Sequence, residues 1–276
     1  MPATPYYLTT PIYYVNDAPH IGHAYTTLAC DVLARFKRLD GYDVKFLTGT
    51  DEHGQKVEKS AQAKGIDPQT FADQVSQNFR TLADFMNFSH DDFIRTTEPR
   101  HIAACQAIWQ RMIDAGEIYL GSYSGWYAVR DEAFYGEGEL TKQPDGSFRA
   151  PSGAEVEWVE EPSYFFRLSA WEDRLLAFYD ANPDFIAPPS RRNEVTSFVK
   201  GGLQDLSVSR TTFNWGVPVP GDDEHIFYVW LDALTNYISA LGYPDEQANT
   251  PPTGPATCIW WARTSCGFMR SIGRPS

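Results

Sequence analysis

Residues 19–23 (Pro-His-Ile-Gly-His) constrain the fold of this chain most, because they join a predicted strand to a predicted helix. Residues 6–10 are aromatic and β-favouring, which is typical of a short strand. Residues 24–39 carry apolar side chains at helical spacing and are followed by Gly41, a common helix stop. We therefore expect residues 19–23 to lie where the strand ends and the helix begins.

This position favours binding of a phosphate group. A helix N-terminus presents N–H groups without helical partners and a partial positive charge. Gly22 allows a flat ligand to approach the backbone, and His20 and His23 share one face of the first helical turn. Two imidazoles there can donate hydrogen bonds to phosphate oxygens in a transition state. The residues alone leave a partial metal site, a helix cap and a chance spacing as alternatives.

Residues 43–48 predict a second strand, so residues 6–48 form a strand–helix–strand unit with parallel strands. The loop that follows, residues 49–54 (Gly-Thr-Asp-Glu-His-Gly), is polar. Open α/β sheets bind ligands at the carboxyl ends of their strands, so Asp51 is a candidate binding residue. The alternative is that Asp51 only caps the helix predicted at residues 55–64. The fold class is α/β, with a doubly wound parallel sheet.

Four motifs in this order resemble the methionyl-tRNA synthetases of the class I aminoacyl-tRNA synthetases. These motifs are residues 10–23, residues 49–54, residues 95–97 (Arg-Thr-Thr) and residues 228–233 (Tyr-Val-Trp-Leu-Asp-Ala). The resemblance covers about residues 5–245 and implies a Rossmann-like nucleotide-binding domain with a connective-peptide insertion. The activity it implies is that of a methionine–tRNA ligase. Such an enzyme uses ATP with Mg²⁺ to convert methionine to methionyl-adenylate and transfers the methionyl group to tRNA(Met).

The resemblance also assigns roles to individual residues. His20, Gly22 and His23 would bind ATP, and the two histidines would stabilise its phosphates during catalysis. Asp51 would bind the methionine ammonium group, and Arg210 would assist around the carboxylate and Asp51. The methionine side chain would lie among Ile12, Tyr14, Trp230, Ala233 and Tyr237. By residue type alone, Arg210 could form a surface ion pair, and the last three residues could be an ordinary core face.

Four segments are expected along the chain. Residues 1–120 begin the catalytic domain, 121–161 form the β-rich connective-peptide insertion, 162–248 form a truncated second part of the catalytic domain and 249–276 form an out-of-frame tail. Residues 203–210 are predicted as a strand returning to the main sheet, and residues 226–230 as a buried strand. Insertions of this family often hold zinc with Cys-x-x-Cys pairs, but Ala128 and Asp131 stand where the first pair would be. Zinc needs thiolate or imidazole ligands at fixed spacing, so we predict no structural zinc and no other metal ligands.

Residues 253–276 lack the periodicity of the preceding chain. We translated residues 253–276 back into one permitted set of codons and read these codons in a shifted frame. The result resembles the expected continuation of the family. Trp260, Trp261 and Met269, the residues in this segment that have a single codon each, agree with it. We therefore hypothesise a single-base frame change between about Pro244 and Pro252. The chain as written lacks the Lys-Met-Ser-Lys-Ser signature and the anticodon-binding domain of the family. We expect it to lack synthetase activity, because those lysines stabilise the leaving pyrophosphate.

The net charge of −13 argues against a protein that coats nucleic acid, although it allows a local basic groove. Residues 1–4 do not begin a signal peptide, and no apolar run reaches membrane-spanning length, so a cytoplasmic protein without a membrane partner is expected. Two other functions remain open. One is a small-molecule nucleotidylyltransferase, and the other is a non-catalytic remnant that binds methionine or ATP.

Overall fold

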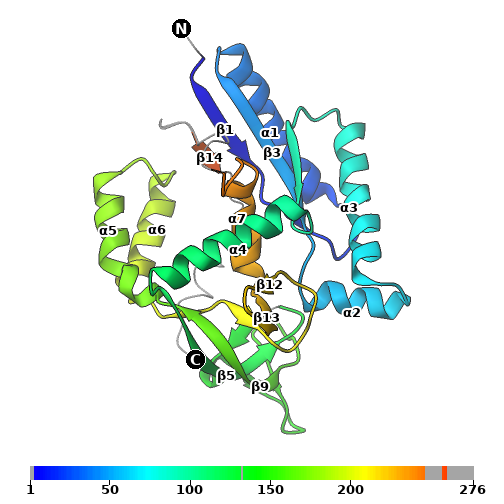
Figure 1. Cartoon of the computed structure of the whole chain (residues 1–276), viewed down its shortest axis with the longest axis vertical. Coiled ribbons are helices and arrows are strands. Elements are labelled where there is room, and N and C mark those ends of the chain that lie inside the picture. Colours follow the sequence, from blue (N-terminus) through cyan, green and yellow to red (C-terminus); the bar gives the residue numbers. More distant parts are fainter. Residues whose placement is uncertain (1–2, 132, 246–256, 260–276) are drawn as a thin grey trace. The chain divides into compact units, whose positions relative to one another are not determined.

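The computed structural model describes residues 3–131, 133–245 and 257–259 (Figure 1). The chain divides into two compact units. Of the described residues, the first contains 3–111, 213–245 and 257–259, and the second contains 112–131 and 133–212. The predicted insertion at residues 121–161 lies inside the second unit, which extends beyond it on both sides.

The first unit is built on a parallel sheet. Its strands are β1 (Pro5–Thr9), β2 (Tyr13–Tyr14), β3 (Asp43–Asp51), β4 (Asp92–Arg95) and β14 (Thr257–Ile259). The order is β14-β1-β3-β2, and β4 also pairs with β3. Tyr6 lies opposite Val44 in the parallel pairing of β1 with β3, which confirms the predicted strand–helix–strand unit.

Helices and one hairpin complete the first unit. They are α1 (Ile21–Leu39), α2 (Gln55–Lys64), α3 (Pro68–Phe85), α4 (Pro99–Asp114), α7 (Val229–Ser239) and the antiparallel strands β12 (Pro218–Val219) and β13 (Asp222–Phe227). The last residues of α4 continue into the second unit. Asp67 caps α3, because its side chain accepts a hydrogen bond from the Thr70 N–H at 2.9 Å.

Helix α1 has two apolar faces. One face packs on the sheet, where Cys30 and Ala34 join Leu8, Val44 and Phe46 in a buried cluster. The opposite face carries large apolar side chains that remain exposed, at Ile21, Tyr25, Leu28, Val32, Phe36 and Leu39. The periodicity that predicted this helix therefore comes in part from residues that do not touch the sheet.

The second unit contains an antiparallel sheet with the order β10-β9-β5-β6. Its strands are β5 (Ile118–Ala128), β6 (Ala133–Tyr135), β9 (Glu157–Phe166) and β10 (Leu206–Ser207), and a separate hairpin pairs β7 (Thr141–Lys142) with β8 (Phe148–Arg149). Helices α5 (Glu172–Ala181) and α6 (Pro189–Lys200) enclose a core of Tyr179, Val195, Val199 and Leu203. Short 3₁₀ helices lie at Glu137–Glu139 and Leu168–Trp171, and β11 is Ser209–Arg210.

Two predicted strands differ from the structure. The strand predicted at residues 203–210 to return to the main sheet is wrong, because β10 pairs antiparallel with β9 through Ser207 and Phe165 in the second unit. The buried strand predicted at residues 226–230 is also wrong at its end. Strand β13 stops at Phe227, and α7 begins at Val229 with Tyr228 as its extended N-cap. A short apolar run fits either a strand or a buried helix, so periodicity could not separate them.

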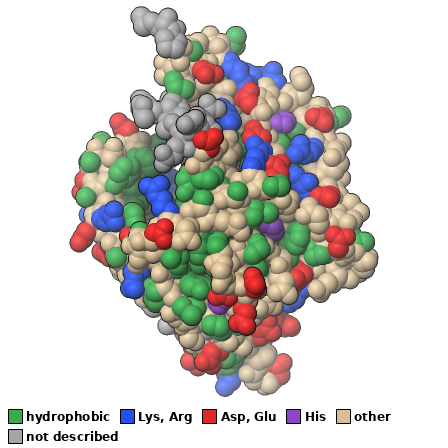
Figure 2. Space-filling view, viewed as in Figure 1, with side chains coloured by type: hydrophobic (Ala, Val, Ile, Leu, Met, Phe, Trp, Pro, Cys, Tyr) green, Lys and Arg blue, Asp and Glu red, His purple; other side chains and the backbone are tan. Residues whose placement is uncertain are grey.

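In the part of the chain that the structure describes, each helix is too short or too polar to cross a membrane. Lys and Arg side chains are interspersed with Asp and Glu on the face drawn in Figure 2.

Candidate functional site

The two histidines of residues 19–23 form a reciprocal cap at the start of α1. His20 is the N-cap, with an extended backbone, and its Nδ1 accepts the N–H of Gly22 at 3.0 Å. The Nδ1 of His23 accepts the N–H of His20 at 3.1 Å. The two rings stack with centroids 3.8 Å apart. The predicted position of residues 19–23 before a helix is confirmed. The helix cap, which was one of the alternatives to a phosphate site, is also present.

These hydrogen bonds fix where a neutral imidazole carries its proton. Because Nδ1 of each ring accepts a backbone N–H, the proton of a neutral ring lies on Nε2. Burial, followed by the charge of His20, lowers the pKa of His23 to about 4. His23 is therefore neutral near pH 7 and offers an N–H donor rather than a positive charge.

Neighbouring aromatic residues hold the His23 ring in place. Its centroid lies 4.8 Å from that of Tyr13 and 5.1 Å from that of Phe79, which belongs to α3. The Tyr13 hydroxyl also hydrogen-bonds Thr27 Oγ1 at 2.7 Å. Tyr13 and Phe79 thus support the candidate site, although neither was predicted to contact His23.

Gly22 is needed for this arrangement. A Cβ atom at position 22 would lie 2.8 Å from Cε1 and 3.0 Å from Nδ1 of His20. A side chain there would therefore displace the ring that caps the helix. This role differs from the predicted one, in which Gly22 admits a flat ligand.

Asp51 lies at the carboxyl end of β3, where ligands of open α/β sheets bind. It is buried and lies opposite Tyr14 in the pairing of β2 with β3. The interpretation of Asp51 as a helix cap is wrong, because Gly54 is the N-cap of α2 and makes no side-chain cap bond.

The residues predicted to surround a methionine side chain come from two parts of the sequence, one near the start of the first unit and one in α7. Ile12 and Tyr237 pack against one cluster that includes Tyr7 and Leu47. Burial raises the pKa of Tyr237 to about 12, and the negative charge of Asp51 adds to this increase, so the two side chains are close. Tyr14 packs on a different cluster, together with Trp215. Trp230 and Ala233 lie on α7 with Tyr237.

Arg210 is buried in the second unit, so the alternative of an exposed surface ion pair is wrong. Its Nη1 donates to Ser207 Oγ at 2.5 Å and to the Ser209 carbonyl at 2.6 Å. Asp51 belongs to the first unit, and the proximity of Arg210 to Asp51 stays a prediction.

A buried ion pair that the sequence interpretation missed lies directly after Asp51. Glu52 is fully buried, and its carboxylate accepts two hydrogen bonds from Arg95, at 2.7 and 2.9 Å. Thr50 and Thr97 each donate a hydroxyl to the same carboxylate at 2.6 Å. Residues 95–97 of the motif therefore hold the end of β3, which carries Asp51, and the loop that follows it. A charged residue at the end of an apolar strand is the sequence signal for such a pair.

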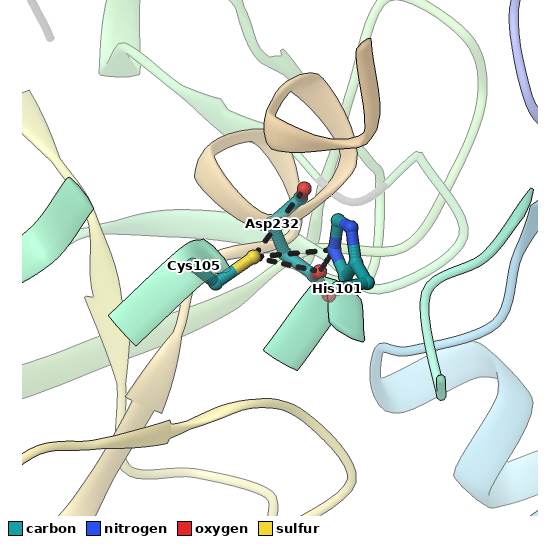
Figure 3. A group of neighbouring side chains, drawn as sticks. All are labelled: His101, Cys105 and Asp232. Atoms are coloured by element: carbon teal, nitrogen blue, oxygen red, sulfur yellow. Dashed lines mark hydrogen bonds and ion pairs between the residues drawn. The ribbon is translucent and has the colours of Figure 1, made fainter. Parts of the chain in front are cut away.

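A second buried network joins the same loop to α7. Asp232 Oδ2 accepts a hydrogen bond from His53 Nδ1 at 2.6 Å, and Asp232 Oδ1 accepts one from His101 Nε2 at 2.7 Å. Cys105 lies beside His101, with its Sγ 3.2 Å from Nε2 (Figure 3). Burial alone would raise the pKa of Asp232, but the charges and hydrogen bonds of His53 and His101 outweigh burial and lower it.

Two places bear on the prediction of no metal. Asp131, at the position where the family often has a zinc-binding cysteine, accepts hydrogen bonds from Arg130, Tyr135 and Ser152. Among the described residues, His101, Cys105 and Asp232 form the one group of three whose ligand atoms lie within 4.8 Å of one another. The prediction of no structural zinc stays a prediction.

Comparison with known proteins identifies one family. The family described as "tRNA synthetases class I (M)" matches residues 6–145 and 147–274. This match extends further than the resemblance seen in the motifs, which ended near residue 245.

Relatives named "Methionine--tRNA ligase" are similar to most of the chain. One from Rickettsia bellii is 68% identical over 251 residues, which are 91% of this chain and 48% of the relative. One from Mesorhizobium japonicum is 62% identical over 254 residues, which are 92% of this chain and 49% of the relative. The chain thus spans about half the length of the curated relatives it matches.

Solved structures are similar as well. The Mycobacterium tuberculosis methionyl-tRNA synthetase in complex with methionyl-adenylate has a TM-score of 0.89 and 51% identity, covering 98% of this chain and 53% of that one. A second structure of the M. tuberculosis enzyme, also bound by methionyl-adenylate, has a TM-score of 0.84 and 56% identity. It covers 88% of this chain and 48% of that chain.

Proposed function

This chain belongs to the family of class I tRNA synthetases, and we propose that it carries the methionine- and ATP-binding part of a methionine–tRNA ligase. The observation that carries the proposal is the reciprocal cap of His20 and His23 at the N-terminus of α1. It leaves the proton of each neutral imidazole on Nε2, at a helix N-terminus whose partial positive charge favours an anion. The similarity to ligases of this name and to an adenylate-bound structure supports the same function.

The reaction would form methionyl-adenylate. An oxygen of the methionine carboxylate attacks the α-phosphorus of ATP, the bond to the bridging oxygen of the β-phosphate breaks, and pyrophosphate leaves. Negative charge grows on the phosphate oxygens, where Nε2–H of His20 and of His23 donate hydrogen bonds. Mg²⁺ bound with ATP would offset further charge. The methionyl group would then pass to the terminal ribose of tRNA(Met), in the cytoplasm.

Methionine would bind next to this turn. Asp51 would pair with the ammonium group, since a buried carboxylate makes a strong charge-assisted hydrogen bond. The thioether would contact the aromatic and aliphatic side chains already predicted, Ile12, Tyr14, Trp230, Ala233 and Tyr237, because sulfur packs well against aromatic rings. Arg210 would assist at the methionine carboxylate.

Isothermal titration of methionine into the 276-residue chain tests this proposal. We expect saturable binding that weakens at least ~10-fold in Asp51→Asn, since a charge-assisted bond contributes about 1.5–3 kcal/mol. Asp223→Asn is the matched control, because Asp223 is exposed. Absence of methionine binding in the unmodified chain would contradict the proposal.

Exchange of pyrophosphate into ATP separates the rival functions. Methionine binding without exchange favours the non-catalytic remnant. Exchange that does not depend on methionine favours a small-molecule nucleotidylyltransferase. Exchange that requires methionine shows that the chain as written is an active enzyme, contrary to our expectation.

A further inference from the structure

The carboxylate of Asp232 connects three elements of the first unit. Asp232 is fully buried on α7, between Trp230 and Ala233. Its two oxygens accept one N–H each, from His53 after β3 and from His101 in the first turns of α4. Figure 3 shows His101 and Cys105 projecting from α4 toward Asp232 on α7. A single side chain thus holds both α4 and the loop after β3 to α7.

Each histidine is itself fixed by further contacts. The His53 ring lies edge-on to Trp215, with centroids 5.3 Å apart. The Trp215 side chain donates its Nε1–H to the Glu52 carbonyl at 2.5 Å. The backbone carbonyl of Trp215 accepts a hydrogen bond from the Gly54 N–H at 2.9 Å. On the other side, His101 Nδ1 lies 3.0 Å from Ser239 Oγ, at the far end of α7. The network therefore includes the backbone on both sides of His53 and both ends of α7.

Hydrogen bonding accounts for this geometry better than a bound metal ion. The 2.7 Å between His101 Nε2 and Asp232 Oδ1 is an ordinary length for a charge-assisted hydrogen bond. Two ligands on a tetrahedral zinc, with bonds of about 2.0–2.1 Å, would lie roughly 3.3 Å apart. Burial also raises the pKa of the Cys105 thiol, which favours the protonated form rather than a metal-binding thiolate.

We propose that Asp232 is a positioning residue for methionine: by holding His53 and His101, it fixes α7 relative to the end of β3. This inference rests on the proposed function. Helix α7 carries Trp230, Ala233 and Tyr237, and β3 ends at Asp51, so the two halves of the proposed methionine site lie on the elements that Asp232 joins. The His20–His23 turn lies on another helix and makes no hydrogen bond to Asp232 among those of the described residues.

The first test compares methionine affinity in Asp232→Asn and in the unmodified chain, at a temperature where both are folded. The amide nitrogen of Asn cannot accept an imidazole N–H, so one buried donor loses its partner. We expect the dissociation constant for methionine to rise at least ~10-fold. Cys105→Ala is the matched control, since it makes a small cavity in the same place and leaves both histidine hydrogen bonds to the carboxylate intact. It removes only weak contacts of the thiol, among them the one with Asp232 Oδ1 at 3.8 Å. An equal loss of affinity in the control would overturn the inference.

A second pair of variants remains informative if Asp232→Asn does not fold. His53→Asn keeps an N–H donor near the position of Nδ1, whereas His53→Leu has a similar size and no donor. We expect His53→Asn to restore methionine affinity to within about threefold of the unmodified chain and His53→Leu to lose it. Equal affinities in the two variants would overturn the inference, because a purely steric role would not distinguish them.

Hydrogen exchange separates failure of this inference from failure of the proposed function. Without any ligand, Asp232→Asn should speed amide exchange at Gly54, whose N–H depends on the Trp215 contact. Unchanged exchange at Gly54 contradicts the positioning role even if methionine binds. Faster exchange in a chain that never binds methionine supports the network and contradicts the proposed function.

Elemental analysis tests the alternative of a bound metal ion. A content near one metal ion per chain that disappears in Cys105→Ala would also overturn the inference.

Discussion

At the scale of single residues, His20 and His23 show how a helix cap can orient donors for a ligand. Each ring uses Nδ1 for a backbone N–H, and this use decides that a neutral ring carries its proton on Nε2. The pair was predicted from its spacing, its place at a strand-to-helix junction and the family resemblance, but the cap and the tautomer follow from the hydrogen bonds. The same contacts make the site sensitive to pH and to the size of residue 22.

His23 should make the folded chain less stable in mild acid. Its pKa is about 4 in the folded chain, because of burial and then the charge of His20, against about 6.5 in an unfolded chain. Between these values the unfolded chain binds a proton that the folded chain does not, so the free energy of unfolding falls as the pH is lowered. Urea unfolding at about pH 7 and about pH 5 measures this loss.

The comparison variant is His23→Asn, which keeps an acceptor for the His20 N–H and does not titrate. We expect the unmodified chain to lose more stability between the two pH values than this variant does. Equal losses would mean that His23 takes up its proton as readily in the folded chain as in the unfolded one.

Gly22→Ala should weaken the start of α1. The new Cβ would lie 2.8 Å from Cε1 of His20, so the ring must move and lose its hydrogen bond to the residue 22 N–H. Loss of an N-cap costs about 0.5–2 kcal/mol, and we expect a decrease of about 1 kcal/mol in the free energy of unfolding. The control is Gly138→Ala, where a Cβ would meet open space. A smaller effect at residue 22 than at residue 138 would contradict the proposed role of Gly22.

At the scale of elements, Glu52 and Arg95 tie β3 to β4. These strands run parallel, with Thr50 opposite Arg95, and this register brings the guanidinium to the carboxylate. Asp73 of α3 accepts a further hydrogen bond from Arg95 at 2.5 Å. The end of β3, strand β4 and helix α3 therefore meet at the ion pair of Glu52 and Arg95, directly after Asp51 in the sequence.

Arg95→Met should destabilise the first unit strongly. The substitution leaves Glu52 fully buried without its cation, and breaking a buried pair from one side costs about 3–5 kcal/mol. Urea unfolding should show a loss of about 3 kcal/mol, and Glu52→Gln combined with Arg95→Met should be less destabilised than the sum of the single variants.

A partly exposed pair in the same unit provides the control. Lys37 lies 3.3 Å from Asp40, and the side chains keep 22% and 49% of their exposure. Lys37→Met should cost less than about 1 kcal/mol. A similar cost for Lys37→Met and Arg95→Met would show that burial of Glu52 does not set the penalty.

At the scale of the whole molecule, local patterns predicted local structure well and long-range pairing poorly. The β1–α1–β3 unit follows from a strand pattern, a helical period and a Gly stop, all within one segment. The partner of residues 206–207 could not be predicted, because a short strand carries no signal for whether it joins a parallel or an antiparallel sheet.

The candidate site shows the same difference between local features, which were predicted, and long-range contacts, which were not. His20, His23 and Asp51 lie at strand ends or helix starts, which the sequence marks directly. The contacts that hold the residues directly after Asp51 were missed, because His53 and Asp232 meet across 179 residues and Glu52 and Arg95 across 43. Periodicity reports only on residues close together in the sequence, so it gives no information about contacts at such separations. The charges themselves were visible, because Glu52 follows shortly after Phe46 and Leu47 and Asp232 lies inside the apolar segment 226–234.

The last prediction concerns residues 249–276. Helices such as α3 and α4 follow a regular apolar period, but this segment does not, and it contains Trp260 beside Trp261 and two prolines at residues 251 and 252. The chain also spans about half the length of its curated relatives. We expect that resequencing the source DNA across codons for residues 240–260 will recover one base inserted or deleted between about Pro244 and Pro252. A DNA sequence that agrees with the printed residues would contradict the hypothesis. Residues 249–274 would then be an in-frame part of the family match, which runs to residue 274.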